Sequence, residues 1–307
     1  MDLSSIAAAI PPLNLRSCII HRQGEIIFEH YRHSQISGEL SKVNSCTKSY
    51  LSALICIALD HGILPSADTK LQEFFPQLRK DKDSRKQHIT LRHLLTMTGG
   101  WHWTEFGGHN SFPRMTRSPD WVGFALDQPL SHQPGEVMEY NSGSSQLLSA
   151  VLAQASGISI ARYAEEYLFG PLGIEAYRWE QDPQGIHTGG FGLWLRPCDL
   201  LSLGLLYLQK GEWKQRQLIS SNYVELSVSP AIDVTAPWRG SYAWHWWNDS
   251  FEEGGGPGYD YFYARGYGGQ FIYVIPSLET IVVLTDDRRK REHPPADVFR
   301  RFIAPYF

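Results

Sequence analysis

A long, almost uninterrupted apolar run between Ser45 and His61 constrains the fold more than any other part of the chain. After its first turn the run carries almost no charge, and Gly62 follows it as a helix stop. A helix that is apolar on every side is stable only when other elements cover it completely. The sequence therefore predicts a central buried helix, with the rest of a 307-residue chain packed around it.

Runs typical of β-strands gather near both ends of the chain. Close to the N-terminus, two short apolar runs enclose a polar stretch that ends in Gly24, which predicts a hairpin. Near the C-terminus, four runs predict strands, and glycines at 254–256 and 258 mark a turn between the first two. The predicted strands are Cys18–Ile20, Ile26–Phe28, Tyr242–Trp247, Tyr259–Ala264, Gln270–Ile275 and Thr280–Thr285.

The middle of the chain favours helices. Ser118-Pro119-Asp120 predicts a helix start, with Ser118 as N-cap and Pro119 at the first helical position. Further helices are predicted over Ser145–Ala155, Ser159–Phe169, Pro197–Lys210 and, to close the chain, Arg288–Ile303.

Strands at both ends with helices between them predict an α+β fold with two lobes. Residues 1–60 and 230–307 would form a mixed lobe with an antiparallel sheet flanked by helices. Residues 61–229 would form an inserted, mostly helical lobe. A cleft between two such lobes is a common place for a ligand site.

Composition excludes several classes of function. The net charge of −4 provides no basic field for nucleic acid or an anionic membrane surface. No run of 18 apolar residues occurs, and Met1–Ile10 lacks the features of a secretory signal, so we expect a cytoplasmic protein. The four cysteines form no C-x-x-C pair, and the twelve histidines form no H-x-x-x-H or H-E-x-x-H motif, so neither zinc nor any cofactor is expected. G-x-S-x-G, P-loop and dinucleotide-binding motifs are also absent from the sequence.

Ser45-Cys46-Thr47-Lys48 is the only S-x-x-K tetrapeptide of the chain, and it opens the predicted central helix. Side chains three residues apart share a helix face, so the Lys48 amine can reach the Ser45 hydroxyl. A serine hydroxyl needs a base to remove its proton, and a lysine can serve when burial lowers its pKa. The pattern predicts a nucleophile with its base; the alternative is an N-cap serine and a solvent-facing lysine.

Tyr140 lies between the Pro134-Gly135 turn and a predicted helix. A tyrosine is protonated at neutral pH, but a neighbouring lysine cation favours the phenolate, which can accept a proton. Tyr140 is therefore predicted as a second proton-handling group, and the alternative is a buried tyrosine with a satisfied hydroxyl.

The segment from Gly266 to Gln270 is rich in glycine and precedes a predicted strand. Glycines let a substrate lie close to a strand edge. The backbone N–H groups of Gln270 and Ser45 can together form an oxyanion hole. The alternative is a plain β-turn or bulge.

In this order the three motifs resemble those of serine β-lactamases and penicillin-binding proteins. Ser45–Lys48 is similar to the family's S-x-x-K, Tyr140-Asn141-Ser142 to the Y-x-N of class C β-lactamases and related esterases, and Tyr267-Gly268-Gly269 to their K-T-G, H-x-G or W-G-G. Residues 89–100, 168–174 and 189–199 also resemble the family's linking segments. The resemblance runs from about residue 40 to 285, favours the branch with 6-aminohexanoate-dimer hydrolase and class C-like carboxylesterases, and implies a β-lactamase/transpeptidase-like fold.

The resemblance places Ser142, Tyr267, Gly268 and Gly269 at the substrate, and two of these depart from the family pattern. Ser142 replaces the asparagine of Y-x-N and is shorter. Tyr267 replaces the lysine of K-T-G and so removes a cation that would pair with a substrate carboxylate. Both changes disfavour β-lactam hydrolysis and D-alanyl-D-alanine peptidase activity.

Two tryptophan-rich segments are further candidates. By the resemblance, Trp101 and Trp103 border the cleft and can bind an apolar acyl or alcohol group; the alternative is that they cover a lobe. Alternation places Trp244 and Trp246 on one face of a predicted strand, where we expect at least one to pack in the core.

Taken together, these features predict a serine hydrolase acting on a small ester or amide through an acyl-enzyme on Ser45. Lys48 or Tyr140 takes the Ser45 proton, and we expect the two groups to titrate as a coupled pair. Two alternatives stay open: a β-lactamase or D-amino-acid peptidase, and a non-catalytic binding or sensor protein on the same scaffold. The sequence makes no prediction about oligomeric state.

Overall fold

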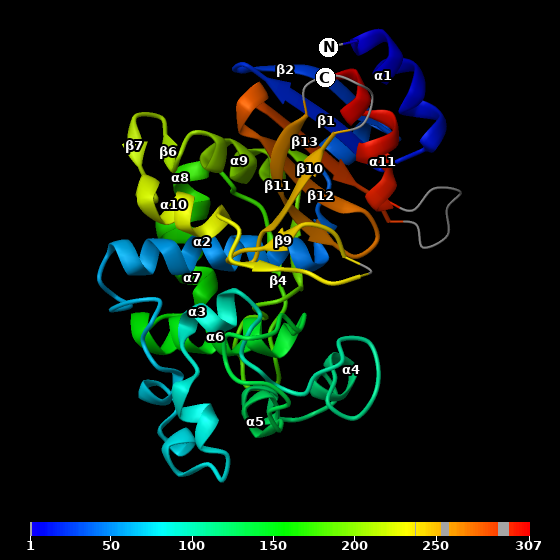
Figure 1. The fold of residues 1–307 in the computed structure, drawn as a ribbon. Coiled ribbons are helices and arrows are strands. Elements are labelled where there is room, and N and C mark those ends of the chain that lie inside the picture. Colours follow the sequence, from blue (N-terminus) through cyan, green and yellow to red (C-terminus); the bar gives the residue numbers. More distant parts are fainter. Residues whose placement is uncertain (1, 237, 253–257, 288–294) are drawn as a thin grey trace.

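The computed structural model describes residues 2–236, 238–252, 258–287 and 295–307, and within them an eight-stranded antiparallel sheet dominates the upper part of Figure 1. Its strand order is β2-β1-β13-β12-β11-β10-β9-β8. The strands are β1 (Ser17–Arg22), β2 (Glu25–Tyr31), β8 (Ile232–Asp233), β9 (Ser241–Tyr242), β10 (Trp247–Phe251), β11 (Tyr259–Gly266), β12 (Gln270–Ile275) and β13 (Thr280–Thr285).

Strands from the two ends of the chain meet inside this sheet. β1 pairs with β13, with Ser17 opposite Thr285 and Arg22 opposite Thr280. β1 and β2 form the predicted hairpin, and β12 and β13 have the predicted bounds. The predicted antiparallel sheet flanked by helices is thus confirmed.

Each face of the sheet carries its own apolar core, because side chains alternate along a strand. Ile272 and Val274 of β12 join the larger core, whereas Phe271 and Tyr273 join the smaller one. Helices cover both faces: α2 (Thr47–Asp60) and α9 (Pro197–Leu208) contribute to the larger core, and α1 (Leu3–Ala9) and α11 (Pro295–Phe302) to the smaller.

α2 is the central buried helix that the sequence predicts. Every residue from Thr47 to Leu59 is buried, and the helix contacts α6 (Ser142–Ser156) and α10 (Ser221–Val228). A short 3-10 turn, η3 (Asn44–Cys46), leads into it. The start of α2 is fixed by Thr47, whose hydroxyl donates to Asn44 O (2.7 Å) and accepts from Leu193 N (3.3 Å).

The remaining elements are short. The other α-helices are α3 (Leu91–Leu95), α4 (Phe112–Met115), α5 (Trp121–Asp127), α7 (Ile160–Ala164) and α8 (Gly170–Leu172), with a π-helical turn (Glu165–Phe169) after α7. β3 (Ser41–Lys42), β4 (Arg178–Trp179) and β5 (Leu193–Leu195) form a small sheet, and β6 (Glu212–Trp213) pairs with β7 (Arg216–Gln217). The remaining 3-10 turns are Pro11–Leu13, Ser34–Ser37, Leu71–Glu73, Pro76–Lys80, Ser84–His88, Pro276–Leu278 and Ala304–Tyr306.

Helices α3, α5 and α6 lie below α2 in Figure 1, away from the large sheet. α9, although it belongs to residues 61–229, packs against β12 and β13. Gly204 permits this close approach, because a Cβ there would lie 2.9 Å from Ile281 and 3.0 Å from Ile272. The division into lobes at residues 1–60, 61–229 and 230–307 stays a prediction.

The predicted helix start at Ser118 is wrong. α5 begins at Trp121, and its N-cap is Asp120, whose carboxylate accepts from Gly123 N at 2.8 Å. Ser118 instead hydrogen-bonds the backbone of Asp120. Ser, Pro and Asp are all common at helix starts. The boundary lies at Asp120 because its carboxylate accepts the N–H of Gly123 in the first turn.

The predicted strand Tyr242–Trp247 is interrupted. β9 ends at Tyr242 and β10 starts at Trp247, while His245 between them has a left-handed φ of 58°. The kink lets the backbone N–H of His245 reach Leu95 O at 3.0 Å. Trp244 and Trp246 are both buried in the larger core, which confirms the expected packing although no strand aligns them.

Some predicted features lie outside the described residues. These are residues 288–294 of the closing helix, which begins at Pro295 where it is described, and glycines 254–256 of the predicted turn. Among the helices that are described, none combines the length and the apolar character needed to cross a membrane.

Candidate active site

Ser45 and Lys48 are adjacent at the start of α2. Ser45 lies in the 3-10 turn, half-buried, and Lys48 one turn further on is only 1% exposed. The Lys48 Nζ atom is 3.3 Å from Ser45 Oγ. The structure therefore places the predicted nucleophile within hydrogen-bond distance of the predicted base.

Two more oxygen atoms surround the Lys48 amine. Gly190 O lies 2.8 Å and Ser142 Oγ 3.0 Å from Nζ. Burial lowers the pKa of Lys48 to about 8, while the negative charge of Glu105 opposes this shift. Gly190 leaves room for the amine, since a Cβ at this position would lie 3.0 Å from Nζ.

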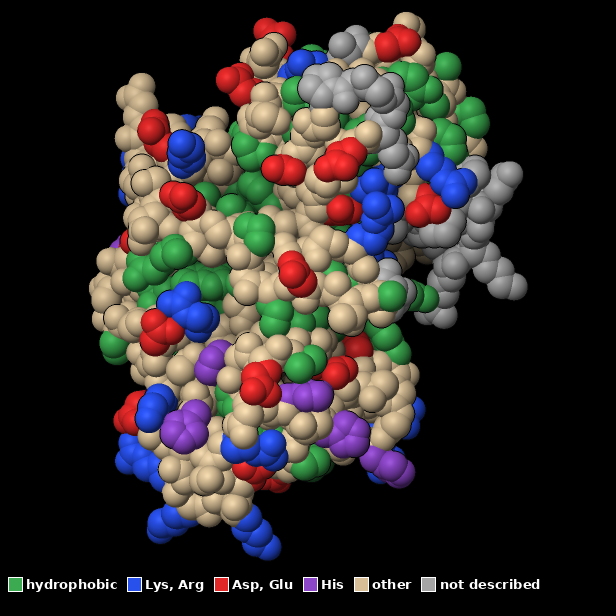
Figure 2. Space-filling model, viewed as in Figure 1, with side chains coloured by type: hydrophobic (Ala, Val, Ile, Leu, Met, Phe, Trp, Pro, Cys, Tyr) green, Lys and Arg blue, Asp and Glu red, His purple; other side chains and the backbone are tan. Residues whose placement is uncertain are grey.

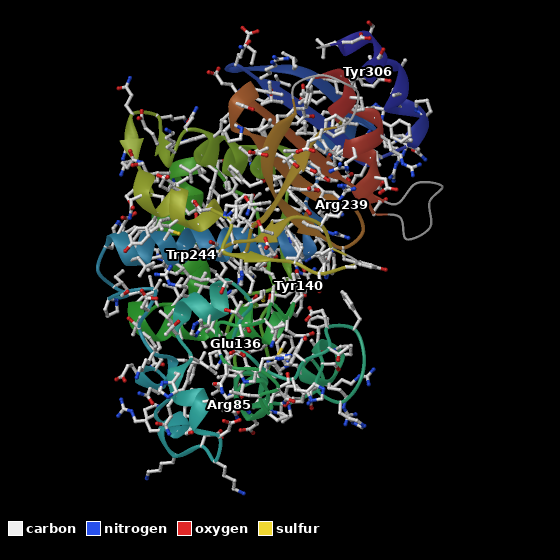
Figure 3. The ribbon with its side chains drawn as sticks, in the orientation of Figure 1. Arg85, Glu136, Tyr140, Arg239, Trp244 and Tyr306 are labelled. Carbon is white, nitrogen blue, oxygen red and sulfur yellow. The ribbon has the colours of Figure 1, made fainter. Side chains whose placement is uncertain are left out.

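Tyr140 comes from the loop that precedes α6 and lies over the same amine. Lys48 Nζ is 4.8 Å from the centre of the Tyr140 ring. The ring is held by Trp247, with which it stacks at 5.8 Å, and by Trp238 at 6.2 Å and Tyr242 at 6.4 Å. Figure 3 shows Tyr140 between the large sheet above and the helices below.

The phenol of Tyr140 is held in its protonated form. Burial raises its pKa, and the negative charge of Glu105 adds to this effect, whereas a hydrogen bond with the Ser45 hydroxyl opposes it. Because the pKa of Lys48 is lowered and that of Tyr140 is raised, the amine of Lys48 is the group that more readily accepts a proton near neutral pH.

Glu105 is a site residue that sequence reasoning missed. Its Oε2 atom accepts from Trp103 Nε1 (2.8 Å) and from Ser142 N (3.0 Å), and its Oε1 atom accepts from the Ser142 hydroxyl. Ser142 thus links the Glu105 carboxylate to the Lys48 amine. In the sequence, the only signal for this role is that Glu105 is the single carboxylate of the aromatic segment 101–106.

Trp101 and Trp103 do not form the predicted substrate surface. Each is 2% exposed and belongs to the larger core. Trp101 packs against Gly99, where a Cβ would lie 2.2 Å from its ring, and Trp103 packs edge-on against Phe124 at 6.3 Å. Buried indole rings are closed to a substrate, and Trp103 instead holds Glu105.

The Gly266–Gln270 segment forms a turn beside Ser45. Gly268 and Gly269 have φ values of 86° and 105°, which are left-handed conformations that favour glycine. The Asn44 side chain donates to Tyr267 O at 2.7 Å, and the Cys46 thiol donates to Gln270 O at 3.5 Å. Both neighbours of Ser45 therefore hold the turn, which brings Gln270 close to the nucleophile.

An open space adjoins this turn. Tyr267 is 65% exposed, whereas the Gln270 side chain is buried and donates to Asp286 O. A cavity of about 490 Å³ lies here, and Asn44, Trp194, Tyr267, Gly268 and Gln270 are among its lining residues. A space of this size accommodates a small molecule.

His245 forms a second buried network behind the site. Its Nδ1 atom faces Leu95 O at 2.9 Å and therefore carries the proton, so Nε2 accepts from the Ser145 hydroxyl at 3.1 Å. The His245 carbonyl accepts from the Ser49 hydroxyl at 2.8 Å. Burial lowers the pKa of His245 to about 3, and the Lys48 cation adds to this effect. A neutral histidine thus joins α2, α3 and α6 beneath the reacting groups.

Across the described ranges, no three His, Cys, Asp or Glu side chains gather as metal ligands would. The structure brings together a hydroxyl, an amine and a phenol, and a carboxylate lies behind them and reaches the amine through Ser142.

Several known proteins are similar to this chain in sequence or in fold. The penicillin-binding protein 4* of Bacillus subtilis (strain 168) is 24% identical over 188 residues, which are 55% of this chain and 39% of that protein, so this chain matches well under half of that relative's length. Among solved structures, a Bacillus anthracis protein assigned as a 6-aminohexanoate-dimer hydrolase has a TM-score of 0.80 at 17% identity, with 98% of this chain and 80% of that chain covered. EstCE1, a hydrolase with promiscuous acyltransferase activity, has a TM-score of 0.70 at 15% identity, with 92% and 91% covered. At such identities these two likenesses show a shared fold.

The family assignment rests on the sequence match that spans most of the chain. The model of the beta-lactamase family matches residues 18–303, which include the S-x-x-K tetrapeptide, Tyr140 and the Gly266–Gln270 turn. The chain belongs to the beta-lactamase family.

Proposed function

We propose that this protein is a serine hydrolase that cleaves a carboxylic ester or a small amide through a covalent acyl-enzyme on Ser45. The observation that carries the proposal is the 3.3 Å separation of Ser45 Oγ from a lysine amine that is buried and has a pKa of about 8. At pH 7 about one-tenth of such an amine is neutral and able to accept a proton. An exposed lysine provides far less of the neutral form.

The first half of the reaction forms the acyl-enzyme. Neutral Lys48 accepts the proton of the Ser45 hydroxyl while Oγ attacks the substrate carbonyl. The N–H groups of Ser45 and Gln270 stabilise the oxyanion of the tetrahedral intermediate. When the intermediate collapses, the bond to the leaving alcohol or amine breaks, and Tyr140 donates a proton to the leaving group. Lys48 then passes to Tyr140 the proton that it took from Ser45.

The second half releases the acyl group. A water molecule attacks the acyl-enzyme carbonyl and gives its proton to the Tyr140–Lys48 pair. The Ser45–acyl bond breaks, Ser45 regains its proton, and a carboxylic acid leaves. No step of this scheme uses a cofactor.

Two features support esters and small amides as the substrate class. The solved structures of similar fold include proteins named as a 6-aminohexanoate-dimer hydrolase and as a hydrolase with promiscuous acyltransferase activity. In addition, Tyr267 stands where β-lactamases carry the lysine that pairs with a substrate carboxylate.

The proposal is tested with p-nitrophenyl acetate and p-nitrophenyl butyrate. We expect wild-type hydrolysis, and losses of about a hundredfold or more for Ser45→Ala, Lys48→Ala and Tyr140→Phe. A fluorophosphonate probe should label Ser45, as located by mass spectrometry of the labelled peptide. Full activity of the Ser45→Ala variant would refute the proposal, and labelling without turnover of any ester would indicate a binding or sensor protein.

A second candidate is a β-lactamase or a D-amino-acid peptidase, which the name of the Bacillus subtilis relative favours. Turnover of nitrocefin together with stable labelling by penicillin would support this candidate. Hydrolysis of p-nitrophenyl esters without either reaction would exclude it.

A further inference from the structure

We propose that Glu105 is a positioning residue that acts through the Ser142 hydroxyl and directs the lone pair of Lys48 toward Ser45. The inference rests on the proposed function, because it concerns the group that accepts the Ser45 proton. Glu105 itself touches neither Ser45 nor Lys48 directly in the hydrogen-bond network; its contact to the amine runs through Ser142.

The Glu105 carboxylate is held in one orientation. Trp103 Nε1 and Ser142 N both donate to its Oε2 atom, at 2.8 Å and 3.0 Å. Ser142 is the first residue of α6, a helix of 15 residues, so the carboxylate also lies at the positive end of the helix dipole. With Oε2 occupied, Oε1 is the atom that faces the Ser142 hydroxyl.

The hydroxyl of Ser142 therefore has a fixed direction. A hydroxyl carries one hydrogen, and an ammonium group has donors but no acceptor. Ser142 Oγ must accept from charged Lys48, 3.0 Å away, and its own hydrogen points to Glu105. The chain of donors runs from Lys48 through Ser142 to the carboxylate.

This direction decides where neutral Lys48 can present its lone pair. The amine has three oxygen neighbours, Ser45 Oγ, Ser142 Oγ and Gly190 O, at 3.3, 3.0 and 2.8 Å. Gly190 O is a carbonyl oxygen and cannot donate, and Ser142 cannot donate to Lys48 while Glu105 holds its hydrogen. Ser45 is then the single neighbour of the three that can donate a proton to the lone pair.

Replacing Glu105 by glutamine, which has nearly the same shape, reverses the direction of the Ser142 hydroxyl hydrogen. The amide oxygen keeps the two N–H donors, Trp103 Nε1 and Ser142 N, so the amide NH₂ faces the Ser142 hydroxyl. Ser142 must then turn its hydrogen away, toward Lys48, where it competes with Ser45 for the lone pair. Loss of the negative charge also favours neutral Lys48, because Glu105 opposes the lowering of the Lys48 pKa.

The experiment compares Glu105→Gln, Ser142→Ala and the double variant with wild type, by kcat and KM for p-nitrophenyl acetate from pH 6 to 9.5. We expect Glu105→Gln to lower kcat by about ten- to a hundredfold with little change in KM, and to move the rising limb of the pH profile to lower pH. The double variant should be more active than Glu105→Gln, because the hydroxyl that competes for the lone pair is gone. Ser142→Ala alone, which disconnects Glu105 without changing it, should also move the limb to lower pH.

Glu180→Gln is the matched control. Like Glu105, Glu180 accepts from an indole, Trp194 Nε1 at 3.3 Å. It also accepts from Lys42 at 2.9 Å, and neither of these two side-chain partners belongs to the hydrogen-bond network around Ser45. Its pH profile should stay that of wild type. The inference is overturned if Glu105→Gln keeps the wild-type kcat and profile, or if the double variant is no more active than Glu105→Gln. If either of these results is found and Ser45→Ala is inactive, the inference about Glu105 fails but the proposed function stands. If Ser45→Ala is active, the proposed function itself is refuted.

Discussion

Lys48→Met should change how the stability of the protein depends on pH. Lys48 has a pKa of about 8 in the fold against a reference value of 10.5. Between these values the unfolded chain binds more protons than the folded protein, so the contribution of Lys48 to the free energy of unfolding rises with pH. Below pH 8 the fold carries the full penalty for a buried cation, about 3 kcal/mol for a pKa difference of this size. Methionine has a similar length and no charge, so it removes the penalty.

The measurable quantity is the difference in unfolding free energy between wild type and Lys48→Met. From pH 7 to pH 9.5 this difference should move in favour of wild type by about 2 kcal/mol, which is the part of the penalty relieved over that range. Hydrogen bonds lost with the amine shift the difference by a constant and do not change its slope. Urea unfolding, followed by tryptophan fluorescence at several pH values, measures this free-energy difference. Lys80→Met is the control, because Lys80 is an exposed lysine. Parallel pH curves for wild type and Lys48→Met would refute the reasoning.

Three shorter predictions follow from other parts of the structure. Gly190→Ala places a Cβ 3.0 Å from Lys48 Nζ, so kcat for p-nitrophenyl acetate should fall about tenfold or more while the urea midpoint of unfolding changes little. An unchanged kcat, or a kcat loss accompanied by a clearly lower urea midpoint, would contradict this. His245→Ala removes the ring donor to Leu95 O and the ring acceptor of the Ser145 hydroxyl and opens a cavity, so urea titration should show a loss of about 2–4 kcal/mol. Cys198 is exposed and the other three cysteines are buried, so a thiol reagent should modify one group in the native protein and four in urea.

The elements that the sequence predicts best are those with a long, regular pattern. The apolar run after Ser45 has one physical solution, a helix covered on all sides, and α2 is that helix. The bounds of β12 and β13 also follow from their patterns, because both strands are apolar along their length and end at turn residues. The three motifs come together because the S-x-x-K helix, the loop before α6 and the turn after β11 meet at one end of the sheet.

What the sequence did not reveal depends on partners far away in the chain. Glu105 has no periodic neighbours, and its role appears only when Ser142, 37 residues later, donates to it. The kink at His245 has the same origin: alternation predicted a strand, but contacts with Leu95, 150 residues away, favour a left-handed residue there. Trp103 was predicted at the substrate because a sequence cannot distinguish an indole that faces a cleft from one that supports the carboxylate behind it.

The surface view shows that charged side chains of both signs are spread over the visible face, with Lys and Arg side chains also gathered beside α11 (Figure 2). Side chains of both signs thus alternate on this face, as the small net charge of −4 leads us to expect.

During synthesis on a ribosome, β1 emerges long before β13, the strand with which it pairs on its inner side. Ser17 and Thr285 are 268 residues apart, and at translation rates of about 5–20 residues per second that interval is on the order of ten seconds to a minute. A two-stranded hairpin is marginal by itself, so in nascent chains the inner edge of β1 stays open until β13 emerges. Growing polypeptides of this type should therefore be clients of ribosome-associated chaperones, and truncations ending before residue 280 should aggregate.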